Sequence, residues 1–229
     1  MTTVTGLPAK DVFWFSEYFM MPMPTGKKAT NLREFMQYLQ DMSDSVLKYH
    51  LWQSRLAIAQ PMVEYPNDFA FWAANALHDI KLAEKLSSIN SFEFVNLTQL
   101  RETMVELVEE YVWDLPHNPT VLPGFELYFC EAPTVVMRSG VSAQTLSQFC
   151  AGLQTVGLDS VYYHFIEARS RWVRNVDDFS YWIENNFAMP ALVSGIRDID
   201  ANFFTLQEVR DTVLALVHQH AGGTCDQSE

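Results

Sequence analysis

Apolar side chains recur at helical spacing along most of the chain, in two sets that resemble each other. An early group repeats at intervals of three and four residues, the pattern of one helix face: Leu32, Phe35, Met36 and Leu39. A later group has the same spacing: Leu146, Phe149, Cys150 and Leu153. The two groups predict equivalent amphipathic helices in the two halves of the chain.

Three more helices are predicted after each of these. The second helix carries His50 on its inner face in the first half and His164 in the second half. The third runs from residue 67 to about residue 86, and its counterpart begins at residue 177. The fourth has the clearest start, because Asn96 and Thr205 are typical N-cap residues, each followed three positions later by Gln or Glu.

A short extended segment precedes each set of helices. Residues 12–18 and 125–129 are rich in aromatic and β-branched residues and are short enough to be strands or extended lids. We therefore predict a mainly α fold, in which each half consists of one short extended segment and four helices.

The two halves also share identical residues in the same order, which predicts a tandem repeat. A shift of 114 positions superposes Phe15 on Phe129 and His50 on His164, and shifts of 110 and 109 superpose the later segments. The expected organisation is a first copy over 1–114, a Pro-containing linker over 115–123, a second copy over 124–220, and a disordered tail over 221–229. We expect the two copies to pack about a pseudo-two-fold axis and to share one core.

Composition and charge narrow the range of partners. Of the 229 residues, 48% are hydrophobic and 14% aromatic, which is enough apolar surface to offset the entropy cost of folding. The 15 Lys and Arg residues are outnumbered by 28 Asp and Glu residues, so the formal net charge is −13. Because nucleic acids and anionic membranes select clustered basic residues, we expect neither as a partner.

Cysteine usage and the N-terminal sequence predict a cytoplasmic protein. Cys130, Cys150 and Cys225 form no CxxC pair, so neither a disulfide framework nor a zinc knuckle is expected. No basic segment followed by an apolar one opens the chain, and no apolar run approaches the roughly 20 residues that cross a bilayer. Nucleotide-binding, metalloprotease and hydrolase motifs are absent, so no cofactor is indicated by a motif.

The candidate chemistry lies in one string that both halves share. It reads Tyr49-His50-Leu51-Trp52-Gln53-Ser54-Arg55 in the first half and Tyr163-His164-Phe165-Ile166-Glu167-Ala168-Arg169 in the second. On an α-helix, residues three apart lie on one face, so Glu167 is placed to orient His164. Arg55 and Arg169 are suited to hold a carboxylate or a phosphate by paired hydrogen bonds.

Three interpretations of this string stay open. His50 and His164 are core histidines bonded to the backbone, with Tyr49 and Tyr163 packed beside them, or the tyrosines, histidines, arginines and Glu167 line a pocket for a small anionic ligand. The third interpretation is a zinc or iron site in which both histidines converge with two carboxylates that the halves share, Glu17 and Glu131.

The segments that the two halves share also carry a resemblance. Thr25-Gly26 with Ala29 and Leu32, the string from Asp159 to Phe165, and Asn67-Asp68-Phe69 with Trp72 resemble the prokaryotic domain of unknown function 5752. The resemblance covers nearly the whole chain and implies a twofold helical repeat, with no activity assigned. In the first half Lys48 stands where the second half has Tyr162, so the two half-sites differ.

These observations predict a non-catalytic accessory or regulatory protein that binds a small anionic molecule or a protein partner. The alternative is a metal- or histidine-dependent enzyme whose site lies where the two copies meet. The sequence specifies no oligomeric state.

Overall fold

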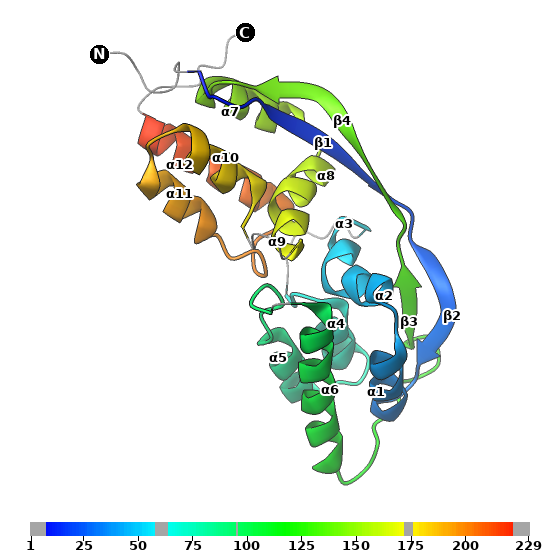
Figure 1. The fold of residues 1–229 in the computed structure, drawn as a ribbon. Helices are drawn as coiled ribbons and strands as arrows, with labels where there is room; N and C mark the ends of the chain where they lie inside the picture. The colour runs from blue at the N-terminus through cyan, green and yellow to red at the C-terminus, as the bar shows by residue number, and fades with distance from the viewer. Residues whose placement is uncertain (1–7, 58–63, 95, 172–175, 222–229) are drawn as a thin grey trace. The chain divides into compact units, whose positions relative to one another are not determined.

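The computed structural model describes residues 8–57, 64–94, 96–171 and 176–221, which form two compact units (Figure 1). Unit 1 combines residues 1–19 with residues 135–229, and unit 2 consists of residues 20–134. Unit 2 is therefore continuous in sequence and is inserted between the two segments of unit 1. Except for Ala221, the expected disordered tail lies outside the described residues.

Unit 2 is a two-stranded sheet packed against helices. Its elements in chain order are β2 (Met23–Ala29), α1 (Leu32–Asp41), α2 (Asp44–Lys48), the π-helical segment η2 (Tyr49–Gln53), α3 (Ser54–Ala57), α4 (Asp68–Asn75), α5 (Ile80–Ser87), α6 (Leu97–Trp113) and β3 (Leu127–Glu131). Strands β2 and β3 pair antiparallel.

Unit 1 has the same kinds of element, but its first strand comes from the start of the chain. Its elements are β1 (Phe13–Met20), β4 (Thr134–Ala143), α7 (Leu146–Thr155), α8 (Leu158–Val161), the π-helical segment η3 (Tyr162–Glu167), α9 (Ala168–Ser170), α10 (Asp178–Asn186), α11 (Pro190–Arg197) and α12 (Leu206–Ala221). Strands β1 and β4 pair with each other and run side by side in Figure 1.

The prediction of a mainly α fold with isolated extended segments was wrong. Four strands form two sheets, so each unit combines a small sheet with helices. Strand β2 escaped prediction because it contains Pro24 and Gly26, residues that are depleted in strands. Between Pro24 and Lys28 the pairing with β3 shifts register, and Gly26 adopts a φ of 78° there. Such a local irregularity on an edge strand tolerates both residues.

Most of the predicted helices are present, and the predicted starts at Asn96 and Thr205 are confirmed. Asn96 accepts a hydrogen bond from the amide of Gln99 at the start of α6. At the start of α12, Thr205 and Glu208 bond each other's main-chain amides, as a capping box requires. The predicted third helix of the first half is in fact two helices, α4 and α5, because the chain turns between them at His78, whose φ is 56°.

Aromatic side chains fill the core of each unit. In unit 1, Phe13 and Phe15 from β1 contact Phe149 of α7, and Phe149 in turn contacts Phe179 of α10. In unit 2, Phe129 of β3 and Phe35 of α1 are fully buried. The strands therefore contribute directly to the core of their unit. None of the described helices combines the length and apolar character that crossing a membrane requires.

Candidate functional site

In unit 1, His164 joins strand β1 to helix α10. Its Nδ1 lies 2.9 Å from a carboxylate oxygen of Asp178, and its Nε2 lies 3.0 Å from the main-chain nitrogen of Ser16. Because Ser16 contributes an N–H, Nε2 must be the acceptor, and the ring proton resides on Nδ1 and points to Asp178. The imidazole is 4% exposed, so both nitrogens are occupied within the protein.

Unit 2 contains the same arrangement with different residues. His50 Nδ1 lies 2.8 Å from Asp68, and His50 Nε2 accepts a hydrogen bond of 3.0 Å from the main-chain nitrogen of Cys130 on β3. His50 is 3% exposed. We call each arrangement a strand clamp: His164 with Asp178 holds β1, and His50 with Asp68 holds β3.

Both clamps contain the residue types of a catalytic triad, but their geometry serves packing. A triad requires the histidine Nε2 to accept a proton from the nucleophile's own side chain. Here Nε2 is taken by the main-chain amides of Ser16 and Cys130. Burial, with a smaller effect of Asp68, raises the pKa of the Cys130 thiol, which keeps it protonated at neutral pH. Neither clamp activates a nucleophile in this geometry.

The two clamp carboxylates were not among the residues predicted from the sequence. Glu167 was expected to orient His164 because an α-helix places residues three apart on one face. The segment is instead π-helical from Tyr162 to Glu167, and a wider turn changes which side chains share a face. Glu167 bonds Ser170 and lies 3.9 Å from Arg171. The signal for Asp68 and Asp178 was their shared place, 110 positions apart, in the segment beginning at residues 67 and 177.

Arg169 is committed to the core of unit 1. Its guanidinium donates to the main-chain oxygens of Ile196 and Ile199, near the end of α11, and lies 3.5 Å from the fully buried carboxylate of Asp177. Burial raises the pKa of Asp177, although the guanidinium opposes that shift. The guanidinium of Arg169 therefore bonds groups of the protein itself. The side chain of Arg55, the matching residue, lies outside the described residues.

The other predicted site residues are distributed among separate surroundings. Tyr49 and Tyr163 each pack at an edge-to-face angle against the neighbouring histidine, and burial raises the pKa of both hydroxyls. Arg171 stacks on the Tyr163 ring at 4.2 Å. The tyrosines thus belong to the surroundings of the clamps.

The predicted metal ligands belong to different units. His164 and Glu17 lie in unit 1, whereas His50 and Glu131 lie in unit 2. Glu17 and Glu131 form no side-chain hydrogen bond or ion pair with any described residue. Across the part of the chain that the structure describes, no group of three or more His, Cys, Asp or Glu side chains is arranged to hold a metal ion.

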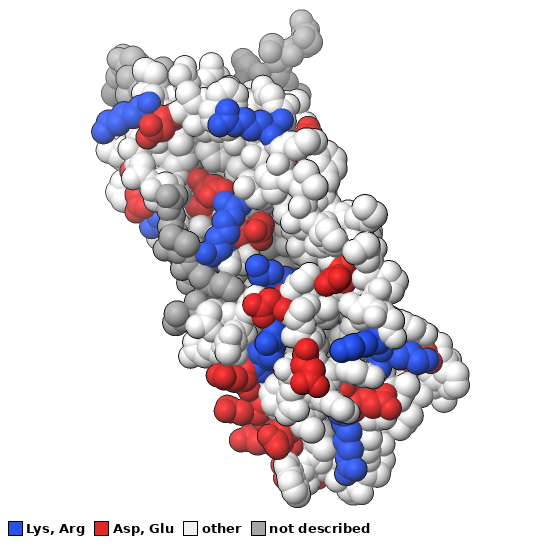
Figure 2. All heavy atoms as spheres, turned by 45° about the vertical axis from the view of Figure 1, so that its right-hand side comes forward, with Lys and Arg blue, Asp and Glu red and all other residues white. Residues whose placement is uncertain are grey.

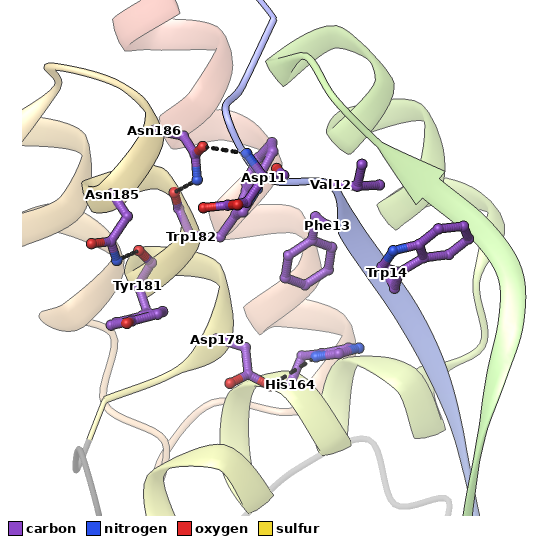
Figure 3. Close-up of a pocket in the computed structure, with 10 residues that line it drawn as sticks. All are labelled: Asp11, Val12, Phe13, Trp14, His164, Asp178, Tyr181, Trp182, Asn185 and Asn186. Atoms are coloured by element: carbon purple, nitrogen blue, oxygen red, sulfur yellow. Dashed lines mark hydrogen bonds and ion pairs between the residues drawn. The ribbon is translucent and has the colours of Figure 1, made fainter.

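A pocket of about 410 Å³ lies beside the clamp of unit 1, between β1 and α10 (Figure 3). Phe13, Trp182 and His164 contribute buried aromatic surface, and the polar lining comes from Asp11, Asp178, Tyr181, Asn185 and Asn186. The side chains of Val12 and Trp14 extend to the opposite side of the strand, as the alternation of a β-strand requires (Figure 3). Sequence analysis singled out only His164 among these residues.

Comparisons with known proteins extend over almost the whole chain. No curated protein matches it. The structure of OrfY from Thermoproteus tenax is similar, with a TM-score of 0.76 and 24% identity over 95% of this chain and 99% of that one. At this identity the similarity shows the fold alone. A family model matches residues 10–218, and the chain therefore belongs to the family of unknown function DUF5752, as its resemblance predicted.

Proposed function

We propose that this chain is a non-catalytic accessory or regulatory protein of the cytoplasm that binds a protein partner. The observation that carries the proposal is that the histidines of both strand clamps are bonded to the protein's own strands. The residues best suited to acid-base chemistry, His50 and His164, have each ring nitrogen bonded within the protein. They hold strands in place, and no proton acceptor is left over on either ring.

Exposed apolar side chains on each of the two sheets support a protein partner. Large apolar side chains that are at least 40% exposed gather on the strands: Trp14, Phe19, Val135, Val136 and Met137 in unit 1, and Met23 and Tyr128 in unit 2. Exposed apolar surface of this kind marks interaction sites in folded proteins. Figure 2 brings the right-hand side of Figure 1 forward and shows areas without charged side chains between the charged ones.

Cations border these apolar residues and indicate the character of the partner. The guanidinium of Arg138 lies 4.8 Å from the centre of the Trp14 ring, and the ammonium of Lys28 lies 5.7 Å from that of Tyr128. Tryptophan, tyrosine and arginine dominate the binding energy of protein interfaces. Lys28 already pairs with Glu126 at 3.1 Å, so we expect a partner surface that is apolar at its centre and carries a carboxylate opposite Arg138.

The proposal includes the tandem repeat. Several hydrogen bonds recur between residues that are 114 or 110 positions apart. Thr25 and Ser139 each donate to the main chain of the paired strand, at Phe129 and Phe15. The indoles of Trp72 and Trp182 donate to the main-chain oxygens of Phe125 and Asp11. These pairs support two copies of one unit, each holding the first strand of the other.

Affinity purification of the intact protein from its own host tests the interaction. Wild type is compared with Trp14→Ser/Met137→Ser and with a control, Phe203→Ser, which removes an aromatic ring that is 60% exposed outside the strands. We expect one stoichiometric partner with wild type and the control, and at least tenfold less with the strand variant at unchanged melting temperature. Equal recovery of the partner by all three proteins would contradict the proposal.

Metal analysis tests the non-catalytic part separately. Protein purified without a His-tag is expected to contain well under one equivalent of zinc or iron. About one equivalent that is lost in His164→Ala, while the fold is retained, would favour the metal-dependent enzyme instead.

A further inference from the structure

We propose that the pocket of unit 1 binds an organic cation, a molecule with an ammonium or amidinium group on a compact apolar body. This inference is independent of the partner surface, because the pocket lies between β1 and α10 and the exposed Trp14 ring extends to the other side of the strand (Figure 3).

Most side-chain nitrogens in the lining already make one hydrogen bond within the protein. The indole of Trp182 donates to the main-chain oxygen of Asp11, and the amides of Asn185 and Asn186 donate to main-chain oxygens within α10. His164 donates to Asp178 through Nδ1. Each amide keeps a second N–H and Tyr181 has a hydroxyl, so what disfavours an anion in this pocket is the charge of Asp11 and Asp178.

The lining also contains acceptors that face no donor of the described residues. Among the described residues none donates to the carboxylate of Asp11, to Oδ1 of Asp178 or to the side-chain oxygen of Asn185. These oxygens suit a ligand rich in N–H groups, and two of the three groups carry negative charge.

Their placement suits a ligand with an apolar body as well as a cationic group. Figure 3 shows Asp11 and Asp178 on opposite sides of the Phe13 ring, with Tyr181 across from it. Aromatic rings attract cations as well as apolar groups, so the rings of Phe13 and Tyr181 add to the attraction of the carboxylates. The volume of about 410 Å³ accommodates a compact organic molecule.

The cations of the protein do not fully neutralise the two carboxylates of the pocket. Arg171 donates to Oδ2 of Asp178 at 3.2 Å and also lies 3.9 Å from Glu167, so its charge is shared by two carboxylates. The carboxylate of Asp11 forms no ion pair with any described residue.

Unit 2 shows that these groups are not needed to build the fold. At the positions 114 or 110 residues away, Asp11 is replaced by Phe125, Tyr181 by Phe71, and Asn186 by Ala76. The oxygen equivalent to the open one of Asp178 is also occupied there, because Ser54 donates to Oδ1 of Asp68 at 2.8 Å, whereas Ala168 stands at the matching position in unit 1. Asn185 is matched by Asn75, so the part of the polar lining found in unit 1 alone is Asp11, Tyr181, Asn186 and the open oxygen of Asp178.

Calorimetric titration of the intact protein with three molecules of nearly the same shape tests the inference. The probes are phenethylammonium, the neutral phenethyl alcohol and the anionic 3-phenylpropionate. We expect one equivalent of phenethylammonium to bind with a Kd near 1 mM or below, at least about tenfold more tightly than either of the others.

Two variants locate the binding. Asp11→Asn keeps both main-chain bonds of Asp11 and is expected to weaken phenethylammonium binding about tenfold. The control Asp41→Asn removes an equal charge from an exposed position in unit 2 and is expected to change nothing. Equal binding of the alcohol, an unchanged Kd in Asp11→Asn, or no binding of the cation at 10 mM would each overturn the inference. The partner surface would stand in every one of these cases.

Discussion

The imidazole of His164 accepts a hydrogen bond from the main-chain amide of Ser16, a residue 148 positions earlier in the chain. The bond is 3.0 Å long and partly buried, and it fixes the register of β1 against the helices of unit 1. His50 and Cys130 form the same bond in unit 2. A side chain that resembles a catalytic base is thus used to position a strand.

Removing a clamp is expected to destabilise the protein. In His164→Ala the Ser16 amide and the Asp178 carboxylate lose their buried partner and a cavity remains, so we expect a loss of about 3 kcal/mol or more. Urea unfolding measures the loss, and hydrogen exchange at the Ser16 amide shows whether it is local to β1. The control His218→Ala, on α12, is expected to change stability by less than about 0.5 kcal/mol. A similar result for both variants would contradict the clamp.

The boundaries of the units predict which fragment folds. A fragment of residues 20–134 contains every element of unit 2, including β3 and Cys130. A fragment of residues 1–114 lacks β3 and keeps β1 without its helices. Thermal unfolding is measured by circular dichroism. We expect a cooperative transition for the first fragment and none for the second. Cooperative folding of residues 1–114 alone would show that the helices of unit 2 do not need β3 to fold.

The buried ion pair of unit 1 makes a third prediction. In Asp177→Asn the amide retains the N-cap role, as Asn67 does in unit 2, but Arg169 loses the partner of its charge. Breaking one partner of a buried pair costs about 3–5 kcal/mol. We expect a loss near the lower end, measured by urea unfolding.

The double variant Arg169→Met/Asp177→Asn separates charge from packing. It removes the unpaired cation and is expected to recover part of the loss. A double variant that is less stable than Asp177→Asn would show that the bonds of Arg169 to Ile196 and Ile199 matter more than its charge.

The start of α1 predicts a dependence on pH. Glu34 accepts hydrogen bonds from the main chain and hydroxyl of Thr30, which lower the pKa of its carboxyl below the usual value. A lowered folded pKa contributes stability above the unfolded pKa of about 4.5, and that stability is lost as the pH falls through the folded pKa. We expect Glu34→Gln to be about 0.5–1 kcal/mol less stable than wild type at pH 7.

Urea unfolding between pH 7 and pH 3 checks this sign. The difference between wild type and Glu34→Gln is expected to shrink towards the acid end. Glu102→Gln, an exposed substitution on α6, serves as the control and is expected to show no such trend. A difference that grows on acidification would refute the role of the Glu34 carboxylate.

The parts of the fold that the sequence predicted depend on local chemistry. Apolar spacing around Leu32 and the caps at Asn96 and Thr205 specify helices through residues a few positions apart. The partner of each strand depends on distant contacts. Phe15 and Phe129 occupy matching positions, so their own sequence does not indicate which set of helices each one packs against. The strand pairing therefore had to come from the three-dimensional structure.

The candidate site was predicted only in part for a related reason. His50 and His164 were identified because both halves contain them, but their partners were chosen by α-helical spacing. The π-helical turns of η2 and η3 alter that spacing, and the clamp carboxylates come from α4 and α10, further along the chain. The pocket was missed because Asp11, Tyr181 and Asn186 are the positions at which the two halves differ.

The insertion of unit 2 into unit 1 has a consequence for synthesis on the ribosome. Strand β1 emerges first, yet the helices that cover Phe13 and Phe15 are made only after all of residues 20–134. At roughly 5–20 residues per second, β1 waits for several seconds or more. During that time the helices of unit 2 are completed before β3, and β1, whose Phe15 matches Phe129, is the strand already available. Strand β1 can therefore compete with β3 for the helices of unit 2 while the chain is being made. The order of synthesis is thus part of how this fold is reached.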